Sequence, residues 1–160
     1  MMRLIAACAL ILAWGTTLSG TASAESGLVQ ASNFKADARI AAQRKIPIMV
    51  LFSSPTCHYC ERVKKEYLVP MHKDPAYRNR VMFREVSVGA DTPLVDFDGS
   101  TITAGEFASF NKVYMVPTVK VFDTRGKEAS EPIVGLLIAD FYFGYLEAAI
   151  DEGIRKVRGK

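Results

Sequence analysis

The chain has 160 residues, of which 49% are hydrophobic, so it can form one compact domain and is too short for two. Its 20 lysines and arginines nearly balance its 17 aspartates and glutamates, and the formal net charge is +3. So weak a bias does not indicate a partner such as nucleic acid or an anionic membrane surface.

The N-terminus has the pattern of a secretory signal peptide. A short basic start precedes a mostly apolar stretch, Leu4–Leu18, and Thr21–Ala24 ends in the small residues of an A-x-A-like cleavage site. We predict that residues 1–24 are cleaved after Ala24 and that residues 25–160 form a single domain exported to the periplasm. A retained membrane anchor is the alternative, but the apolar stretch is interrupted and shorter than the roughly 20 residues of a membrane span.

After a loose leader over residues 25–31, the domain is predicted to begin with a helix and a buried strand. The helix is expected over about residues 33–44. The run Ile46–Phe52 is apolar without polar alternation, as in a strand that is buried on both faces. A charged helical segment follows, and it is expected to end at about Val69 because Pro70 disfavours its continuation.

Two cysteines, Cys57 and Cys60, stand where the predicted strand passes into this helix. A helix N-terminus carries partial positive charge and unpaired N–H groups, which favour the thiolate of Cys57 and lower its pKa. Removal of the leader takes away Cys8, so the pair would be the only cysteines exported to an oxidising compartment. A structural disulfide gains little from so short a loop. The pattern therefore favours a pair that cycles between dithiol and disulfide.

The second half of the domain is predicted to hold three more strands and two helices. The strands are expected over residues 81–88, 119–122 and 132–136, and the helices over about 103–112 and 139–157. Residues 89–99 are expected to form a loop. The last two strands are joined by a short turn, Asp123–Lys127, and must be antiparallel, whereas strands separated by helices favour parallel pairing. We therefore predict an α/β domain with a mixed four-stranded sheet and helices on both faces.

Two groups of side chains on the predicted helices have ordinary structural explanations. Arg62, Lys64 and Lys65 are expected to form the solvated face of the helix that follows the cysteines. The aromatic residues of the last helix are expected to pack against the rest of the domain: Phe141, Tyr142, Phe143 and Tyr145.

With these elements in place, the chain resembles the thioredoxin superfamily. The likeness covers essentially all of residues 25–160. It rests on the CxxC motif after the first core strand, on Met115–Thr118 before the third strand, and on the turn and Gly135 before the final helix. Within the superfamily the chain is most similar to exported bacterial thioredoxins of the SoxW type. The resemblance implies the thioredoxin fold and a monomeric disulfide reductase that uses no cofactor.

The resemblance also implies a role for each residue of the site. Cys57 matches the exposed nucleophile, and Cys60 matches the cysteine that resolves the mixed disulfide. Pro117 matches the cis-proline beside the disulfide, and Val116 would offer its backbone to an extended substrate segment. His58 and Tyr59 replace the usual Gly-Pro between the cysteines. His58 would stabilise the thiolate further and make the couple more oxidising, unless it is simply solvated.

A second departure from the thioredoxin pattern lies on the strand before the motif. Thioredoxins have a buried aspartate there that helps to move the proton of the resolving cysteine, and the matching residue here is Leu51, six before Cys57. The proton must then pass to water or to another carboxylate. Glu85 is a candidate by position, although a surface or loop role would explain it equally well.

Other functions remain open from the sequence alone. A periplasmic disulfide oxidase of the DsbA-like kind also has valine before the proline, but the helical insertion of such oxidases is missing. A non-catalytic thioredoxin-fold binding module would not need two intact cysteines. A zinc site would need further ligands, and only His58 and His72 are strong candidates. We therefore expect no metal, protein disulfides as substrates, a membrane-linked electron donor and no nucleic-acid partner.

Overall fold

The computed structural model describes residues 27–136 and 138–159, so the predicted signal peptide over residues 1–24 lies outside the described residues. The helical elements are α1 (Phe34–Arg44), α2 (His58–Val63), the π-helical turn η1 (Lys64–Leu68), α3 (Val69–Lys73), the 3₁₀ turn η2 (Pro75–Tyr77), α4 (Ala104–Phe110) and α5 (Ala139–Val157). The strands are β1 (Ile48–Ser53), β2 (Met82–Ser87), β3 (Pro93–Val95), β4 (Thr101–Thr103), β5 (Thr118–Phe122) and β6 (Ile133–Val134). None of the helices within the described ranges is long and apolar enough to span a membrane.

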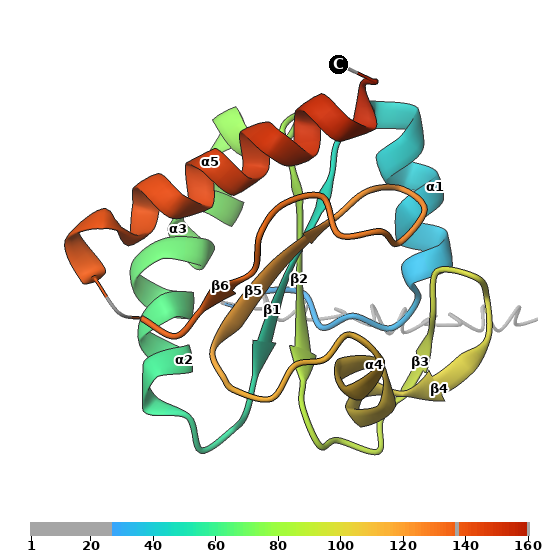
Figure 1. The fold of residues 1–160 in the computed structure, drawn as a ribbon, viewed down its shortest axis with the longest axis horizontal. Coiled ribbons are helices and arrows are strands. Elements are labelled where there is room, and N and C mark those ends of the chain that lie inside the picture. Colours follow the sequence, from blue (N-terminus) through green and yellow to red (C-terminus); the bar gives the residue numbers. More distant parts are fainter. Residues whose placement is uncertain (1–26, 137, 160) are drawn as a thin grey trace, which may run out of the picture.

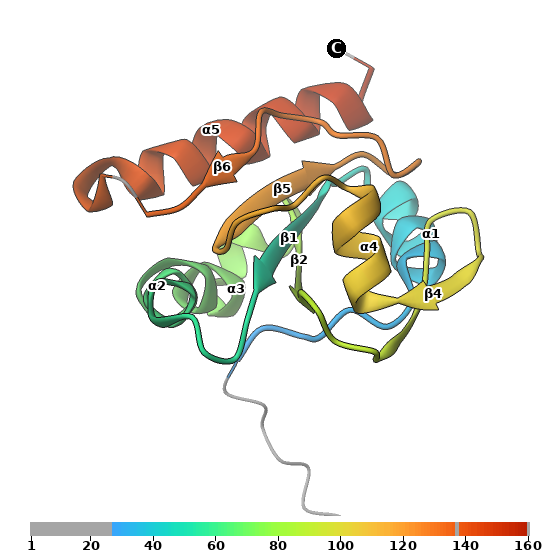
Figure 2. The same ribbon diagram turned by 60° about the horizontal axis from the view of Figure 1, so that its bottom comes forward.

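The main sheet has four strands in the order β2-β1-β5-β6 (Figure 1). Strand β1 pairs parallel with β2 and antiparallel with β5, and β5 pairs antiparallel with β6. All six residues of β1 are buried, because each face of the sheet is covered by helices. Met49 and Leu51 belong to one core cluster, and Ile48 and Val50 belong to the other. Helices α2, α3 and α5 lie on one face of the sheet, and α1 and α4 lie on the other (Figure 2). This confirms the predicted mixed sheet with helices on both faces.

Strand β5 differs from the prediction in its direction. A helix separates it from β2, which favoured parallel strands, but β5 runs antiparallel to β1 and therefore also to β2. The connection between β2 and β5 contains a second, two-stranded sheet, in which β3 pairs antiparallel with β4. The segment 89–99, which was expected to be a loop, thus includes the strand β3. A strand of three residues is too short to show the alternation of polar and apolar residues that would predict it. Ser87 at the end of β2 and Thr118 at the start of β5 both lie beside the end of β1, so this long connection leaves and re-enters the sheet at the same end.

The helix after the cysteines continues past Pro70, contrary to the prediction. It widens into the π-helical turn η1, where the Val69 N–H bonds to the carbonyl of Lys64, and then resumes as α3. A proline ring normally crowds the carbonyl four residues earlier, here that of Glu66. The wider turn immediately before Pro70 changes this spacing, so the helical path is kept.

The aromatic residues of α5 are mostly exposed, which corrects the expectation that they pack. Tyr142 is 1% exposed, whereas Phe141, Phe143 and Tyr145 are 65%, 48% and 48% exposed. The first turns of α5 extend beyond the edge of the sheet in both views, so only one side of the helix meets other elements there (Figures 1 and 2).

Candidate active site

The two cysteines lie at the start of α2, just after β1 ends. Cys57 is the N-cap residue of α2, with extended backbone angles, and its N–H donates to the carbonyl of Ser54 at 3.0 Å. Cys57 and Cys60 are joined by a disulfide with their Cα atoms 5.2 Å apart. The Sγ of Cys57 accepts a hydrogen bond from the N–H of Cys60 at 3.1 Å, so an unpaired N–H of the first helical turn points at this sulfur.

The two sulfurs differ in their access to solvent. Cys57 is half-buried, whereas Cys60 is 1% exposed and faces inward with Val63. An incoming group can therefore reach Cys57 first, and Cys60 can be reached mainly through Cys57. Such an arrangement suits one attacking and one resolving thiol.

The two residues between the cysteines lie on the outer side of α2. His58 and Tyr59 are both exposed, and their rings approach edge-on with centroids 6.0 Å apart. Tyr59 is 56% exposed and so adds an apolar surface next to Cys57. The role predicted for His58 in stabilising a thiolate stays a prediction.

Val116 and Pro117 lie at the same end of the sheet as the cysteines. Their peptide bond is cis, and Pro117 is buried just before β5. The next residue, Thr118, is the register partner of Phe52, which is near the end of β1 and shortly before the CxxC segment. The carbonyl of Pro117 accepts a hydrogen bond from the N–H of Gly135 at 2.7 Å, which fixes this loop against β6.

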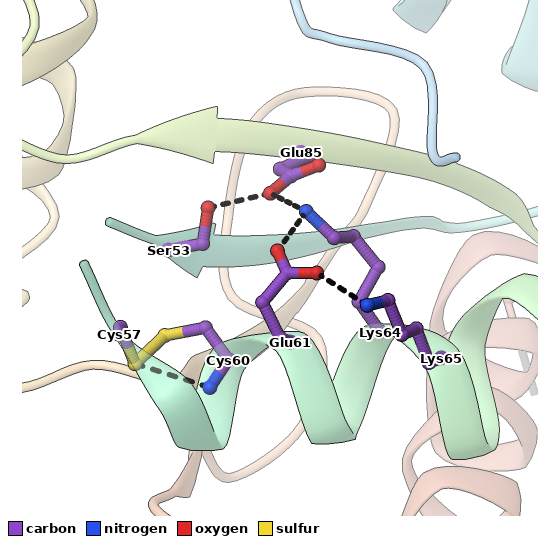
Figure 3. Close-up of polar contacts among 7 residues, drawn as sticks. All are labelled: Ser53, Cys57, Cys60, Glu61, Lys64, Lys65 and Glu85. Carbon is purple, nitrogen blue, oxygen red and sulfur yellow. Dashed lines mark hydrogen bonds and ion pairs between the residues drawn. A yellow bond between two sulfur atoms is a disulfide. The ribbon is translucent and has the colours of Figure 1, made fainter. Parts of the chain in front are cut away.

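A buried polar network lies between the sheet and α2 (Figure 3). Glu85 is only 4% exposed, and its Oε1 accepts hydrogen bonds from Ser53 Oγ at 2.6 Å and Lys64 Nζ at 3.1 Å. Lys64 also pairs with Glu61 at 2.8 Å, and Glu61 pairs with Lys65 at 3.5 Å. The network thus runs from a buried carboxylate to the surface of α2.

Charge pairing in this network favours the ionised forms of Glu61 and Lys64. The hydrogen bond from Lys64 lowers the pKa of Glu61 below its usual value. Burial acts to lower the pKa of Lys64, but its hydrogen bonds to Glu61 and Glu85 outweigh burial, so the pKa is raised. Lys64 therefore does not belong to a purely solvated helix face, and Glu85 is neither a surface nor a loop residue.

The segment before α1 completes the cover over Glu85. The N–H of Glu85 donates to the carbonyl of Val29 at 2.9 Å, and its carbonyl accepts from the N–H of Ala31 at 2.8 Å. Gln30 thereby forms a parallel bridge beside β2, and Leu28 is buried. The end of the predicted loose leader is thus part of the sheet edge. The apolar Leu28-Val29 pair is the only signal for this in the sequence.

Within the described ranges, no three histidine, cysteine, aspartate or glutamate side chains gather in a group that could hold a metal ion. The site thus combines the Cys57–Cys60 disulfide, the exposed rings of His58 and Tyr59, and the buried carboxylate of Glu85. A cysteine pair of this kind can undergo thiol–disulfide exchange.

Comparisons with known proteins identify the family and the fold. A family described as "Thioredoxin-like domain" matches residues 34–150. Mitochondrial thioredoxin 3 of Saccharomyces cerevisiae in its oxidised form is 18% identical, with a TM-score of 0.50 over 78% of this chain and 94% of that one. A thioredoxin of Trichomonas vaginalis is 19% identical, with a TM-score of 0.51 over 78% and 96%.

The oxidised C-terminal domain of DsbD from Neisseria meningitidis is 20% identical, with a TM-score of 0.51 over 76% of this chain and 99% of that one. At these identities the likeness to solved structures shows the fold alone. A search of curated proteins found no match.

Proposed function

The chain belongs to the thioredoxin-like domain family, and from this membership we propose that it is a protein-disulfide oxidoreductase that works as a reductase, in the manner of exported bacterial thioredoxins of the SoxW type. The observation that carries the proposal is the pair at the start of α2. A half-exposed Cys57 caps the helix, and a buried Cys60 is bonded to it.

In the proposed cycle, the Cys57 thiolate attacks one sulfur of a substrate disulfide. The substrate S–S bond breaks, its other sulfur leaves as a thiolate that takes up a proton, and a mixed disulfide forms. Cys60 then loses its proton and attacks the sulfur of Cys57. The substrate leaves fully reduced, having gained two electrons, and the Cys57–Cys60 disulfide is restored. A separate electron donor must reduce that disulfide before the next turnover.

We propose that Glu85 takes the proton of Cys60 in the resolving step. Leu51 cannot do so, and Glu85 is its register partner on β2, so both side chains point to the α2 side of the sheet. Lys64 lies one turn after Cys60 on the same helix and bonds to Glu85. A carboxylate at this place supports proton exchange between the buried thiol and the surface group Glu61.

The substrate is proposed to be an extended polypeptide that lies along Val116. Support comes from the exposed apolar side chains on the loop before Pro117, since Tyr114 and Met115 are 86% and 62% exposed. A pocket of about 200 Å³ lies between these two residues and Val134, and it offers room for a side chain next to the substrate cysteine.

We further propose that the protein is exported to the periplasm, loses residues 1–24, and acts there as a monomer reduced by a membrane-linked donor. The signal-like N-terminus and the CxxC motif support this reading. The second candidate is a disulfide oxidase with the same site run backwards. The observation that favours it is His58, an exposed histidine inside the motif.

The proposal is tested with reduced protein, residues 25–160, and a peptide disulfide that fluoresces when its bridge is cut. The unmodified protein should open one peptide disulfide per molecule. Cys57→Ser should be inactive, and Cys60→Ser should stop at a mixed disulfide that is visible as a mass increase. A Cys57→Ser variant as active as the unmodified protein would contradict the proposal, and so would a Cys60→Ser variant that forms no adduct. Ser54→Ala, beside the motif, is the matched control and should stay active.

A further inference from the structure

A second concave site lies at the other end of the sheet from the cysteines. It is a pocket of about 370 Å³ bounded by α1, by α3 and η2, and by the segment that begins β2. The register Ile48↔Met82 places it beside the start of β1, whereas Cys57 follows the end of β1. In Figure 1 the end of α1 lies at the top of the view and the loop that enters α2 at the bottom. The pocket is therefore separate from the redox site.

Cationic side chains line this pocket, and no carboxylate does. Arg44 comes from α1, Arg78 follows η2, and Arg84 comes from β2. Arg84 is already held by Asp37, which accepts from its Nε at 2.8 Å and from a terminal nitrogen at 2.5 Å. Over the part of the chain that the structure describes, Arg44 and Arg78 form no ion pair. Their two guanidinium groups are thus available to an anion.

Apart from His72 and Tyr77, the rest of the lining is apolar. Phe83 is buried with 3% exposed, and Ile40 is 45% exposed at the rim. An exposed isoleucine beside free guanidinium groups is suited to a ligand with a charged end and an apolar body. Guanidinium forks match the oxygens of phosphates and carboxylates in a bidentate geometry, and small-ligand pockets combine apolar walls with a few such polar groups.

His72 gives the pocket a titratable group through which the binding of a ligand can be measured. Its half-buried ring meets Phe83 edge-on, with centroids 5.8 Å apart. Burial lowers the pKa of His72, and the charges of Arg84 and Lys73 lower it further. The charged groups around it are Lys73 from α3, the three arginines of the pocket and Asp37, whose carboxylate is engaged with Arg84. An anion bound here would raise the pKa of His72.

We propose that this pocket binds an organic oxyanion, a phosphate or carboxylate carried on an apolar group. The oxyanion lies between Arg44 and Arg78, and the apolar part rests against Ile40 and Phe83. The site is independent of the thiol chemistry, because it shares no residue with the CxxC end of the sheet.

The test is a titration of the oxidised protein with phenyl phosphate, followed through the imidazole signals in ¹H–¹⁵N spectra. The described domain has two histidines, and His58 at the redox site is an internal reference. We expect a saturable shift and a raised pKa for His72 alone. Benzoate in a parallel titration tells a carboxylate ligand from a phosphate one by its relative affinity. Inorganic phosphate and benzyl alcohol should each bind more weakly than phenyl phosphate.

Arg44→Gln and Arg78→Gln should each weaken phenyl phosphate binding about tenfold, since each removes a charged hydrogen-bond donor. Arg39→Gln is the matched control, because Arg39 is exposed on the same helix outside the pocket. All three positions are exposed, and thermal unfolding checks that each variant folds. The proposal is overturned if His72 shows no saturable shift with either anion. It is also overturned if benzyl alcohol binds as tightly, or if Arg39→Gln weakens binding as much as the pocket variants.

Discussion

At the scale of single residues, Glu85 stands out because a buried carboxylate is costly unless its charge is compensated. Ser53 and Lys64 supply that compensation at 2.6 and 3.1 Å. Lys64 is in turn shared with Glu61, whose side chain is 42% exposed. The buried carboxylate is therefore connected to solvent through Lys64 on η1 and Glu61 on α2, as a proton acceptor for Cys60 would need to be.

Replacing Glu85 by glutamine should slow the resolving step and leave the first attack by Cys57 almost unchanged. Glutamine keeps the shape of the side chain but cannot accept the proton, so the mixed disulfide should persist about a hundredfold longer at neutral pH. The two steps are separated by rapid mixing, acid quenching and mass analysis of the adduct. Raising the pH should restore much of the resolving rate, because solvent then removes the proton.

Glu66→Gln is the control for that experiment, since Glu66 lies on η1 together with Lys64, the partner of Glu85, but pairs with Arg62 at the surface. It should leave both steps unchanged. Equal adduct lifetimes in Glu85→Gln and the unmodified protein would remove Glu85 from the mechanism. A change in overall stability alone would not alter the pH profile of one step, so the profile separates the two explanations.

The lowered pKa of His72 predicts how the free energy of unfolding depends on pH. Its folded-state pKa lies below the unfolded value of about 6.5, so the unfolded chain binds the proton more readily. Its contribution to stability is complete above pH 6.5 and is lost as the pH falls through the folded-state pKa. In a buffer without phosphate, His72→Gln should therefore lose less unfolding free energy between pH 7.5 and 5.5 than the unmodified protein, as measured by urea unfolding. Equal losses would contradict this assignment.

At the scale of elements, the segment from α2 to α3 shows what local sequence can and cannot predict. The Cys57 position and the helix start follow from the strand-to-helix change in pattern, and the structure places both as predicted. The passage through Pro70 does not follow, because a π-helical turn has no sequence signal of its own. The start of α4 does have a local sequence signal, because Thr103 and Glu106 stand at capping-box spacing and bond within a single turn.

Tyr67, in the π-helical turn, ties this segment to the last helix. Its hydroxyl donates to the carbonyl of Ala139, the first residue of α5, at 2.9 Å. Tyr67→Phe should lower the unfolding free energy by about 1 kcal/mol and speed amide exchange in the first turn of α5. Tyr145→Phe on exposed α5 surface is the control and should change neither. An unaltered stability and exchange rate in Tyr67→Phe would show that this bond does not hold α5.

At the scale of the whole molecule, the layers were predictable and the contacts between distant segments were not. The apolar run Ile46–Phe52 predicts a strand that is buried on both faces. The helices that cover both faces of the sheet follow from that burial. The pairing of Gln30 with Glu85 and the direction of β5 depend on long connections, which no local pattern records. The burial of Glu85 is of the same kind, because its partners Ser53 and Lys64 come from other elements.

Export is a prediction about the whole chain. Expressed from its own start in a bacterium with a periplasm, the protein should be found in the periplasmic fraction with a mass that begins at Glu25. Ala24→Arg should block the cleavage, because the cleavage site needs a small residue there. A full-length mass in the membrane fraction of the unmodified chain would instead support the retained anchor.

The measurement that tests the central claim most directly is the equilibrium reduction potential of the Cys57–Cys60 pair. The protein is equilibrated in graded thiol buffers, free thiols are trapped by alkylation, and modified cysteines are counted by mass. We expect one reversible two-electron transition at a potential below the glutathione range of about −220 to −260 mV. A potential well above that range would contradict the reductase direction and indicate an oxidase. The absence of any reversible transition would contradict thiol–disulfide exchange altogether.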